Sequence, residues 1–553
     1  MVREEMTLGA VLDAAAEKRP DQDALVYVDR GLRYTYREFR DRVDLLARGL
    51  LALGVEKGEH VALWAVNLPE WVLLQFATAK VGAVLVTVNT NYQRHELKHV
   101  LGQSDATTLF LAEGYRDVDC MAALYDVVPE VRDPAWPASG CPDLPRLRRV
   151  VFLGQGEPPG TLPFARLYEL GRGVAPAALA QRQARLSPAD PINMQYTSGT
   201  TGFPKGVLLS HANIVANARA QAQVLGFSES DRLCIPVPFF HCFGCVMSTL
   251  LCVCSAATMV PVETFDAGLV LRAIEAERCT AVHGVPTMFI ALLDHPDFPR
   301  RDLTSLRTGI MAGAPCPVEL MRRVMGGMHM TEICITYGQT EASPGITMTR
   351  RDDSLERRVS SVGRALPGVE VKIADPETGA DVPPGAQGEL WSRGYNTMLG
   401  YYKMPEATAE TVDADGWLHT GDLATMDEHG YCKITGRLKN MIIRGGENIF
   451  PREIEEFLYT HPQVLHAEVV GVPDFKYGEQ VLAAIVPRNG TVLTREQIQA
   501  FCRGKIARHK IPHYVMFLPS LPTTASGKVQ KFVLRDWAIE RYGLAEAAKV
   551  ETA

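Results

Sequence analysis

The sequence lacks several features that would assign its class at once. Its 553 residues carry a formal net charge of -7, so no basic surface for nucleic acid is expected. The first six residues contain no apolar signal-peptide core, and the last four are not a peroxisomal address. We therefore expect a cytoplasmic protein that binds small molecules at local sites rather than nucleic acid.

Charge is also missing from one long stretch, since Leu233 to Val262 contains no Asp, Glu, Lys or Arg. Prolines and a glycine interrupt its first half, which favours a buried helix and strand over a transmembrane segment. The 12 cysteines follow no disulfide-scaffold spacing and are expected to be reduced. In this apolar setting we interpret one Cys cluster beside His241 as packing residues, not as a zinc site: Cys242, Cys245, Cys252 and Cys254.

The chain is too long for one hydrophobic core, so at least two domains are expected. Apolar runs alternate with helical periods in the first third, which predicts parallel sheets with crossover helices. The expected strands are 60–66, 84–88 and 107–111, and the expected helices are 7–19, 37–53 and 68–81. Residues 129–160 are rich in proline and are interpreted as a surface connection around a strand at 149–153. Strands at 467–472, 483–486 and 514–518 with a helix at 494–502 predict a small α+β domain.

Ten positions, Thr197 to Gly206, hold three glycines, four hydroxyl residues and one lysine. Glycines let backbone N–H groups approach a phosphate, hydroxyls add donors, and lysine supplies a cation. The string is not a Walker A loop, because Pro204 precedes the lysine and Gly206 follows it. Composition alone leaves a surface turn open. The candidate phosphate-binding residues are Thr197, Ser198, Gly199, Thr200, Thr201, Gly202, Phe203, Pro204 and Lys205.

Three further strings carry nucleotide chemistry. In Tyr337-Gly338-Gln339-Thr340-Glu341 the aromatic ring can stack on a purine, and the carboxylate can hold Mg²⁺. Asp422, in Thr-Gly-Asp, can accept hydrogen bonds from both ribose hydroxyls. Lys528 stands in a Gly/Ser/Thr loop. The alternatives are a polar turn for the first string, a capping residue for Asp422 and a solvated lysine for Lys528.

Together these strings resemble those of the acyl-adenylate-forming ligases: acyl-CoA synthetases, adenylation domains of peptide synthetases, and luciferases. The resemblance covers residues near 190 to 535. Within that superfamily, Phe501–Ile506 and Gly527–Phe532 most resemble the medium-chain fatty acyl-CoA ligase branch typified by family member 2.

The resemblance implies an α/β fold with a large N-terminal adenylate-binding domain of βαβ subdomains at 1–436. A hinge at 437–440, centred on Lys439, and a small mobile C-terminal α+β domain at 441–553 would follow. It implies catalytic roles for Lys528, Thr340, Glu341 and His241, with Mg²⁺ at Glu341. Besides the phosphate loop, it implies that ATP and AMP are bound by Gly313, Ala314, Pro315, Tyr337, Gly338, Gln339, Asp422 and Arg437.

It further implies that CoA is bound by Arg444, Gly445, Gly446 and Glu447. We expect the acyl pocket to be lined by Phe240, His241, Val246, Met247, Met288, Met311 and Gly313.

The expected activity is ligation of a carboxylic acid to CoA through an acyl-adenylate, with ATP, Mg²⁺ and CoA as the small molecules required. A medium-chain fatty acid is favoured, while aryl and dicarboxylic acids stay open. The alternatives are an enzyme that loads a carrier protein, a luciferase-like enzyme, and a non-catalytic nucleotide-binding regulator. The last predicts loss of Lys528, Glu341 or Asp422, and all three are present. Oligomeric state is open, with a homodimer among the options.

Overall fold

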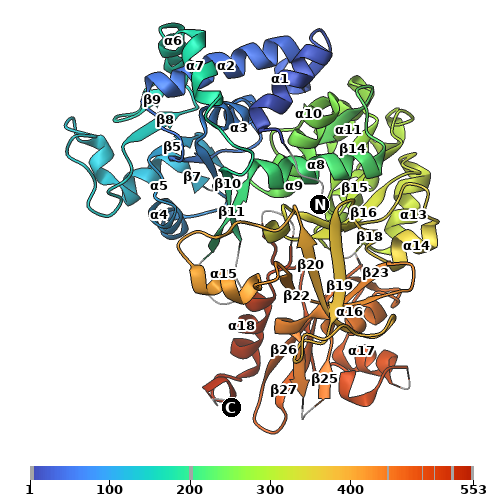
Figure 1. Cartoon of the computed structure of the whole chain (residues 1–553). Coiled ribbons are helices and arrows are strands. Elements are labelled where there is room, and N and C mark those ends of the chain that lie inside the picture. The colour runs from blue at the N-terminus through green and yellow to red at the C-terminus, as the bar shows by residue number, and fades with distance from the viewer. Residues whose placement is uncertain are drawn as a thin grey trace. The chain divides into compact units, whose positions relative to one another are not determined.

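The computed structural model describes residues 5–116, 118–197, 204–314, 316–444, 447–488, 490–503, 505–524 and 528–549. The chain divides into two units, coloured along the sequence in Figure 1. The first comprises Met1–Val371 and Ser392–Leu418, and the second comprises Lys372–Trp391 and His419–Ala553. The expected hinge at 437–440 falls inside the second unit. As a point of movement, that hinge stays a prediction.

An eight-stranded sheet in the first unit has the strand order β21-β11-β10-β4-β3-β5-β8-β9. Strand β3 pairs in parallel with β4 and β5, and helix α3 (Pro69–Val81) forms the crossover from β3 to β4. This confirms the parallel arrangement predicted from the alternating pattern. The strands are β3 (His60–Trp64), β4 (Val84–Thr87), β5 (Thr108–Leu111), β8 (Arg149–Phe152), β9 (Leu162–Pro163), β10 (Pro191–Thr197), β11 (Lys205–Ser210) and β21 (Gly400–Tyr401).

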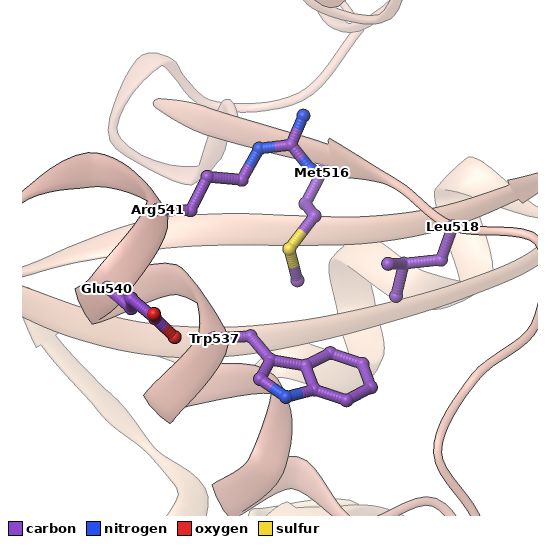
Figure 2. A pocket seen from close by; sticks show the side chains of 5 residues that line it. All are labelled: Met516, Leu518, Trp537, Glu540 and Arg541. Carbon is purple, nitrogen blue, oxygen red and sulfur yellow. The ribbon is translucent and has the colours of Figure 1, made fainter.

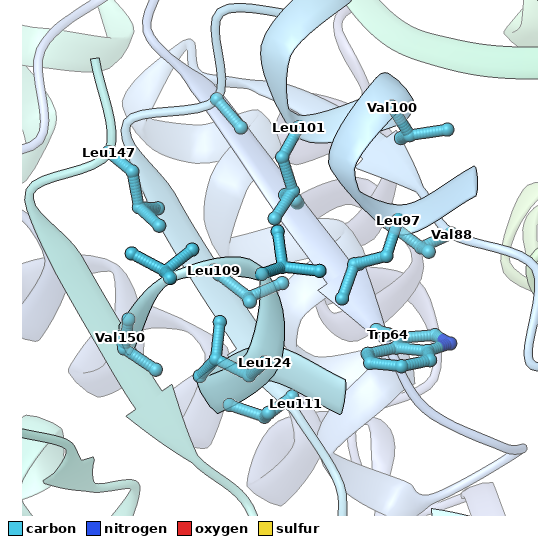
Figure 3. Close-up of a cluster of buried hydrophobic side chains, with 14 of the residues drawn as sticks. Trp64, Val88, Leu97, Val100, Leu101, Leu109, Leu111, Leu124, Leu147 and Val150 are labelled. Carbon is cyan, nitrogen blue, oxygen red and sulfur yellow. The ribbon is translucent and has the colours of Figure 1, made fainter. Parts of the chain in front are cut away.

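Helices α4 (Arg94–Gln103) and α5 (Cys120–Val127) contribute to one hydrophobic cluster with this sheet (Figure 3). Leu97, Leu109 and Leu124 are completely buried there, and each contributes roughly 1.5–3 kcal/mol of transfer free energy. The segment expected to be a surface connection contributes Cys141, Leu144 and Leu147 to the same cluster. That expectation was therefore wrong for these residues, because a few apolar side chains without regular spacing leave no periodic signal.

Helix α2 (Tyr36–Ala52) shows how local sequence sets element ends and packing. It begins with a capping box, in which Thr35 and Glu38 accept each other's backbone N–H groups. Helix α6 (Ala165–Arg172) packs so closely on α2 that a Cβ at Gly49 would lie 2.2 Å from the Leu167 carbonyl oxygen. A larger residue at position 49 would therefore separate the two helices. Helices α1 (Leu8–Lys18) and α7 (Pro176–Gln183) complete this part of the chain.

The second large sheet of the first unit has nine strands in the order β18-β17-β16-β15-β14-β12-β13-β1-β2. Its six strands from β16 to β1 are parallel, with antiparallel strands at both edges. The strands are β1 (Asp23–Tyr27), β2 (Leu32–Thr35), β12 (Arg232–Ile235), β13 (Thr258–Pro261), β14 (Ala281–Gly284), β15 (Thr308–Met311), β16 (Cys334–Gly338), β17 (Gly345–Met348) and β18 (Arg364–Ala365). The helices around it include α8 (His211–Leu225), α11 (Ala267–Ala276), α12 (Pro286–Leu293), α13 (Val318–Gly327) and α14 (Leu355–Ser360).

The charge-free stretch begins within β12 and then forms the buried helix and strand that were expected. After β12 the chain passes through α9 (Cys242–Gly244), a π-helix at Cys245–Leu250 and α10 (Leu251–Ser255) before β13. All six residues of the π-helix are buried. Among the described residues, no helix has the length and apolarity needed to cross a membrane. Ten of the 12 cysteines are buried, and Cys254 and Cys316 are half-buried.

The second unit contains a sheet in which β25, β24, β27 and β26 are neighbours and β28 pairs in parallel with β27. Helices α16 (Pro451–Leu458) and α17 (Arg495–Cys502) pack on it through a buried cluster that includes Ile454, Leu458 and Ile498. This confirms the α+β pattern predicted for the tail. The strands are β24 (Ile442–Arg444), β25 (Glu447–Ile449), β26 (Val464–Asp474), β27 (Gly478–Pro487) and β28 (Tyr514–Phe517).

The sequence pattern did not predict helix α18 (Lys531–Tyr542), which buries Leu534 and Ala538 in a separate cluster of the second unit. A further sheet, β19-β20-β22-β23, carries the Thr-Gly-Asp string. Its strands are β19 (Val369–Ala374), β20 (Gly388–Gly394), β22 (Leu418–Met426) and β23 (Cys432–Arg437).

Candidate active site

Four neighbouring parallel strands of the nine-stranded sheet lead into the predicted adenylate and acyl segments. Strand β12 is followed by Phe240 and His241, β15 by Gly313, and β16 ends at Tyr337-Gly338. Strand β14 lies between β12 and β15 and leads into the helix that carries Met288. Carboxyl ends of parallel strands meet at one edge of a sheet, where α/β proteins bind ligands. The topology therefore gathers motifs that are far apart in the sequence.

The apolar residues expected at the acyl group are inside the protein. Their burial is compatible with an apolar pocket, while their contact with an acyl chain stays a prediction. Gly313 is exposed and has a φ of 86°, a conformation that favours glycine. The buried side chains are Phe240, Val246, Met247, Met288 and Met311.

His241 is half-buried and caps the short helix α9. Its Nδ1 accepts a hydrogen bond from the Phe243 N–H at 3.1 Å. In a neutral imidazole this places the ring proton on Nε2, which makes that nitrogen a donor. Next to it, the Cys242 thiol lies 3.5 Å from the Thr340 hydroxyl. The segment that follows β12 and the turn after β16 are thus in contact.

Thr340 and Glu341 lie on a short 3₁₀ turn, Thr340–Ala342, that follows β16. The Tyr401 hydroxyl donates to Glu341 Oε1 at 2.8 Å, and the Lys205 ammonium lies 4.7 Å from the centre of the Tyr401 ring. Strand β11, which begins at Lys205, pairs with β21, which ends at Tyr401. The structure therefore brings a predicted phosphate lysine and a predicted metal carboxylate to the same tyrosine. The sequence analysis missed Tyr401, which has no motif of its own.

Helix α8 supports the turn that carries Glu341 through the side chain of Asn217. Asn217, which is completely buried, donates to the Gly345 carbonyl at 2.9 Å and accepts from the Gly345 N–H at 3.0 Å. Gly345 faces Gly338 across β16 and β17, where a Cβ on Gly338 would lie 1.9 Å from the Pro344 carbonyl oxygen. Only glycine therefore fits at position 338. Asn217 was also missed, because an asparagine inside a helix has no distinctive sequence context.

His283 on β14 is a third residue that the sequence did not reveal. Its ring is completely buried, stacks on the Phe243 ring at an interplanar angle of 28° and places Nδ1 3.1 Å from the Ser248 hydroxyl. Burial lowers the pKa of His283 to about 3, so the imidazole is neutral near pH 7. A neutral histidine therefore packs behind the π-helix that carries Val246 and Met247.

In the second unit, Asp422 and Arg437 lie opposite each other on β22 and β23. Arg437 Nε donates to Asp422 Oδ1 at 2.5 Å, and Asp422 is only 5% exposed. The turn before Asp422 is fixed by Glu389, which accepts from the Gly421 N–H at 2.7 Å and from the Trp391 indole at 2.8 Å. The structure thus brings the predicted ribose pair together. Its role in binding ribose stays a prediction.

Lys528 is exposed at the end of a loop whose two sides join at a bridge between Thr523 and Val529. The loop and α18 are fastened to β26 by Lys531, whose ammonium lies 2.6 Å from Glu455 Oε1 and 3.2 Å from Glu468 Oε2. Burial beside the Glu455 carboxylate raises the pKa of Glu468 to about 7. A buried charge cluster therefore anchors the chain three residues after Lys528.

Among the predicted CoA residues, Arg444 donates from Nε to Gln480 Oε1 at 2.7 Å and lies over the Tyr477 ring at 4.4 Å. Several predicted positions lie outside the described part of the chain, as do the side chains of Lys439 and Glu447. These positions are Ser198, Gly199, Thr200, Thr201, Gly202, Phe203, Pro315, Gly445 and Gly446.

A hollow of about 330 Å³ in the second unit is lined by residues of β28 and α18 and the segment between them (Figure 2). None of the predicted site residues lines it. Within the described residues, no group of three or more His, Cys, Asp or Glu side chains could hold a metal ion. A single carboxylate such as Glu341 is still compatible with Mg²⁺, because that ion is commonly held by one or two carboxylates together with substrate phosphates.

The fold and the residues at its strand ends define an adenylate-forming ligase. A family model described as AMP-binding enzyme matches residues 12–402, and one described as AMP-binding enzyme C-terminal domain matches residues 453–528. The chain belongs to the AMP-binding enzyme family, within its acyl-CoA synthetase group.

Its relatives cover nearly the whole chain. It is 52% identical to the putative acyl-CoA synthetase YngI of Bacillus subtilis, over 98% of both chains. It is 42% identical to the mitochondrial medium-chain acyl-CoA ligase ACSF2 of Danio rerio, over 97% of this chain and 89% of that one. The anthranilate CoA ligase AuaEII, solved with anthranoyl-AMP, superposes with a TM-score of 0.85 at 28% identity over 98% of both chains.

Proposed function

We propose that this enzyme is an AMP-forming carboxylate–CoA ligase that activates a medium-chain fatty acid in the cytoplasm, as part of fatty acid metabolism. The observation that carries the proposal is the contact of Lys205 and Glu341 with one tyrosine. A cation for phosphate oxygens and a carboxylate for Mg²⁺ are the two groups that an ATP α-phosphate needs beside it. ATP, the carboxylic acid and CoA are the substrates.

In the first half-reaction the acid's carboxylate oxygen attacks the α-phosphorus of ATP, and pyrophosphate leaves. Lys205 and the loop before it hold the phosphates, while Thr340 and Lys528 donate to the oxygens that gain charge in the transition state. Mg²⁺ held by Glu341 would neutralise phosphate charge. His241 would border the acid's carboxylate, where its Nε2–H can donate. Tyr337 would stack on adenine, and Asp422 with Arg437 would bind ribose.

In the second half-reaction the CoA sulfur attacks the acyl carbonyl carbon, and AMP leaves with the bonding pair of the acyl–phosphate bond. The thiol proton passes to solvent. Family resemblance supports a rotation about Lys439 between the two steps, which would withdraw Lys528 and bring Arg444 to the CoA. Hinge motions are absorbed at a few residues with large φ/ψ changes.

The medium-chain preference is supported by the relatives named as medium-chain acyl-CoA ligases and by the burial of the candidate pocket residues. Apolar walls favour an alkyl chain, because burial of each CH₂ contributes about 0.8 kcal/mol. A panel from acetate to palmitate, with benzoates and dicarboxylic acids, tests this by thioester formation. The proposal predicts the highest kcat/KM for medium-chain acids. A preference for benzoates or diacids would contradict it.

Lys528→Ala tests the reaction itself, with the two half-reactions measured separately. Adenylate formation should fall by roughly 10²- to 10³-fold, which corresponds to about 3–4 kcal/mol of transition-state stabilisation. Thioester formation from supplied acyl-adenylate should be nearly unchanged. Lys433→Ala, at an exposed lysine on β23, is the matched control and should retain both rates. Equal losses in both half-reactions would contradict the role of Lys528. Transfer of the acyl group to a carrier protein, without turnover of CoA, would instead favour the carrier-loading alternative.

A further inference from the structure

Tyr401 stands between two charged groups that the proposed reaction needs. Its hydroxyl donates to Glu341 Oε1 at 2.8 Å, and its ring lies 4.7 Å from the Lys205 ammonium. We propose that Tyr401 is a positioning residue that orients the metal-binding carboxylate with its hydroxyl and holds the phosphate-binding lysine with its ring. The inference rests on the proposed function, in which Glu341 binds Mg²⁺ and Lys205 binds phosphate.

The backbone around Tyr401 is fixed on both sides. Its N–H donates to the Thr408 hydroxyl at 2.9 Å. The N–H groups of Leu399 and Tyr402 donate to carbonyl oxygens of Leu208 and Gly206, at 2.9 and 2.8 Å. The last two bonds tie β21 and its flanking residues to β11, the strand that begins at Lys205. The tyrosine ring and the lysine are therefore carried by one rigid pair of strands.

Residues 398–401 also form hydrogen bonds with the turn that carries Glu341. The Met398 N–H donates to the Glu341 carbonyl at 2.9 Å, while Tyr401 binds the side chain. The terminal torsion of a glutamate is broad and only two-fold, so a carboxylate needs an oriented hydrogen bond to hold one plane.

The ring of Tyr401 also positions the Lys205 ammonium. A lysine within about 6 Å of an aromatic centroid is attracted to the ring face by roughly 0.5–2 kcal/mol. In the part of the chain that the structure describes, no ion pair joins Lys205 to Glu341. The aromatic contact leaves the ammonium its donors, and the hydroxyl contact leaves the carboxylate its second oxygen. Both charged groups therefore contact Tyr401 without forming a direct ion pair with each other.

Two substitutions separate the hydroxyl from the ring. Tyr401→Phe removes the bond to Glu341 and keeps the ring, whereas Tyr401→Leu removes both. Tyr402→Phe is the matched control, because the Tyr402 hydroxyl donates to the Asp105 carboxylate at 2.9 Å and not to Glu341. Binding of a non-hydrolysable ATP analogue is measured by calorimetry with and without Mg²⁺, together with the Mg²⁺ dependence of pyrophosphate release.

Tyr401→Phe should reduce the gain in analogue affinity from Mg²⁺ by roughly 10- to 150-fold and leave metal-free affinity unchanged, as one lost hydrogen bond to a charged group predicts. Tyr401→Leu should also weaken metal-free binding by roughly 2- to 30-fold. Tyr402→Phe should change neither. A Mg²⁺ gain unchanged in Tyr401→Phe, or reduced equally in Tyr402→Phe, would overturn the inference. Glu341→Gln separates this failure from that of the proposed function: if Glu341→Gln also keeps the full Mg²⁺ gain, the metal role of Glu341 is wrong.

Discussion

Replacing Asn217 by leucine would test how the catalytic turn is supported. The substitution conserves volume closely, so its effect arises from lost hydrogen bonds rather than from a cavity. The Gly345 N–H would lose its acceptor at 3.0 Å, and the Gln221 amide would lose its acceptor at 2.6 Å. The Gly345 carbonyl would keep a donor, since Asn396 Nδ2 lies 3.1 Å away.

Each buried group left unsatisfied costs about 1–3 kcal/mol, so Asn217→Leu should lower the free energy of unfolding of the first unit by about 2–6 kcal/mol. Gly345 pairs with Gly338, on the strand that leads to Thr340 and Glu341. Turnover in pyrophosphate release should therefore fall by roughly 10- to 100-fold, because small displacements of catalytic groups are costly.

Urea unfolding and pyrophosphate release measure the two effects. Gln223→Ala is the matched control, since Gln223 is exposed on the same helix. The control should stay within about 0.5 kcal/mol of the wild type. An equally small change for Asn217→Leu would refute the hydrogen-bond argument. Lower stability with unchanged turnover would refute the link between Asn217 and the catalytic turn.

Two further predictions follow from burial. Burial lowers the pKa of His283 to about 3. Between about pH 6.5 and pH 3 the unfolded chain therefore binds a proton at this histidine that the folded unit does not bind. The free energy of unfolding rises with pH across that window. Lowering the pH from 7 to 5 should cost about 2 kcal/mol through this group, and urea unfolding at both pH values should show His283→Gln without that loss. In the second unit, Arg437→Met should destabilise the fold by about 1–3 kcal/mol, more than Asp422→Asn, because it removes the guanidinium from a carboxylate that is 5% exposed. Denaturation measures this difference, and a higher KM for ATP in both variants checks the ribose role.

Most elements could be predicted from the sequence because their signals are local. The strands at 60–64, 84–87 and 108–111 are short apolar runs, and the helices between them begin with a proline or a capping box. The residues 141–147 and helix α18 could not be recognised this way. The apolar side chains of residues 141–147 are few and irregularly spaced, and those of α18 do not share one face, since Leu534 and Ala538 are buried while Phe532 and Trp537 are exposed. Only the packing of the finished fold shows which of these side chains are buried.

The candidate site was predictable where one short string carries the chemistry, as with Glu341 and Asp422. The residues that support these strings were not. Tyr401 reaches Glu341 across 60 residues of sequence, and Asn217 reaches Gly345 across 128. Both contacts depend on sheet order and strand register, which a single sequence does not specify. Supporting residues are therefore the ones that a motif search misses.

The two pairs of oppositely charged residues, Asp422 with Arg437 and Glu341 with Lys205, differ in whether the charged groups touch. Asp422 and Arg437 are joined directly at 2.5 Å, whereas Lys205 and Glu341 are held through the neutral side chain of Tyr401. At an effective dielectric constant of about 20, two unit charges 4 Å apart attract each other by about 4 kcal/mol. If Lys205 and Glu341 were paired directly, ATP would have to break that attraction before the lysine could bind phosphate and the carboxylate could bind a metal ion. A ribose needs only hydrogen bonds from groups that can stay paired. The indirect arrangement is therefore the one suited to a phosphate and metal site.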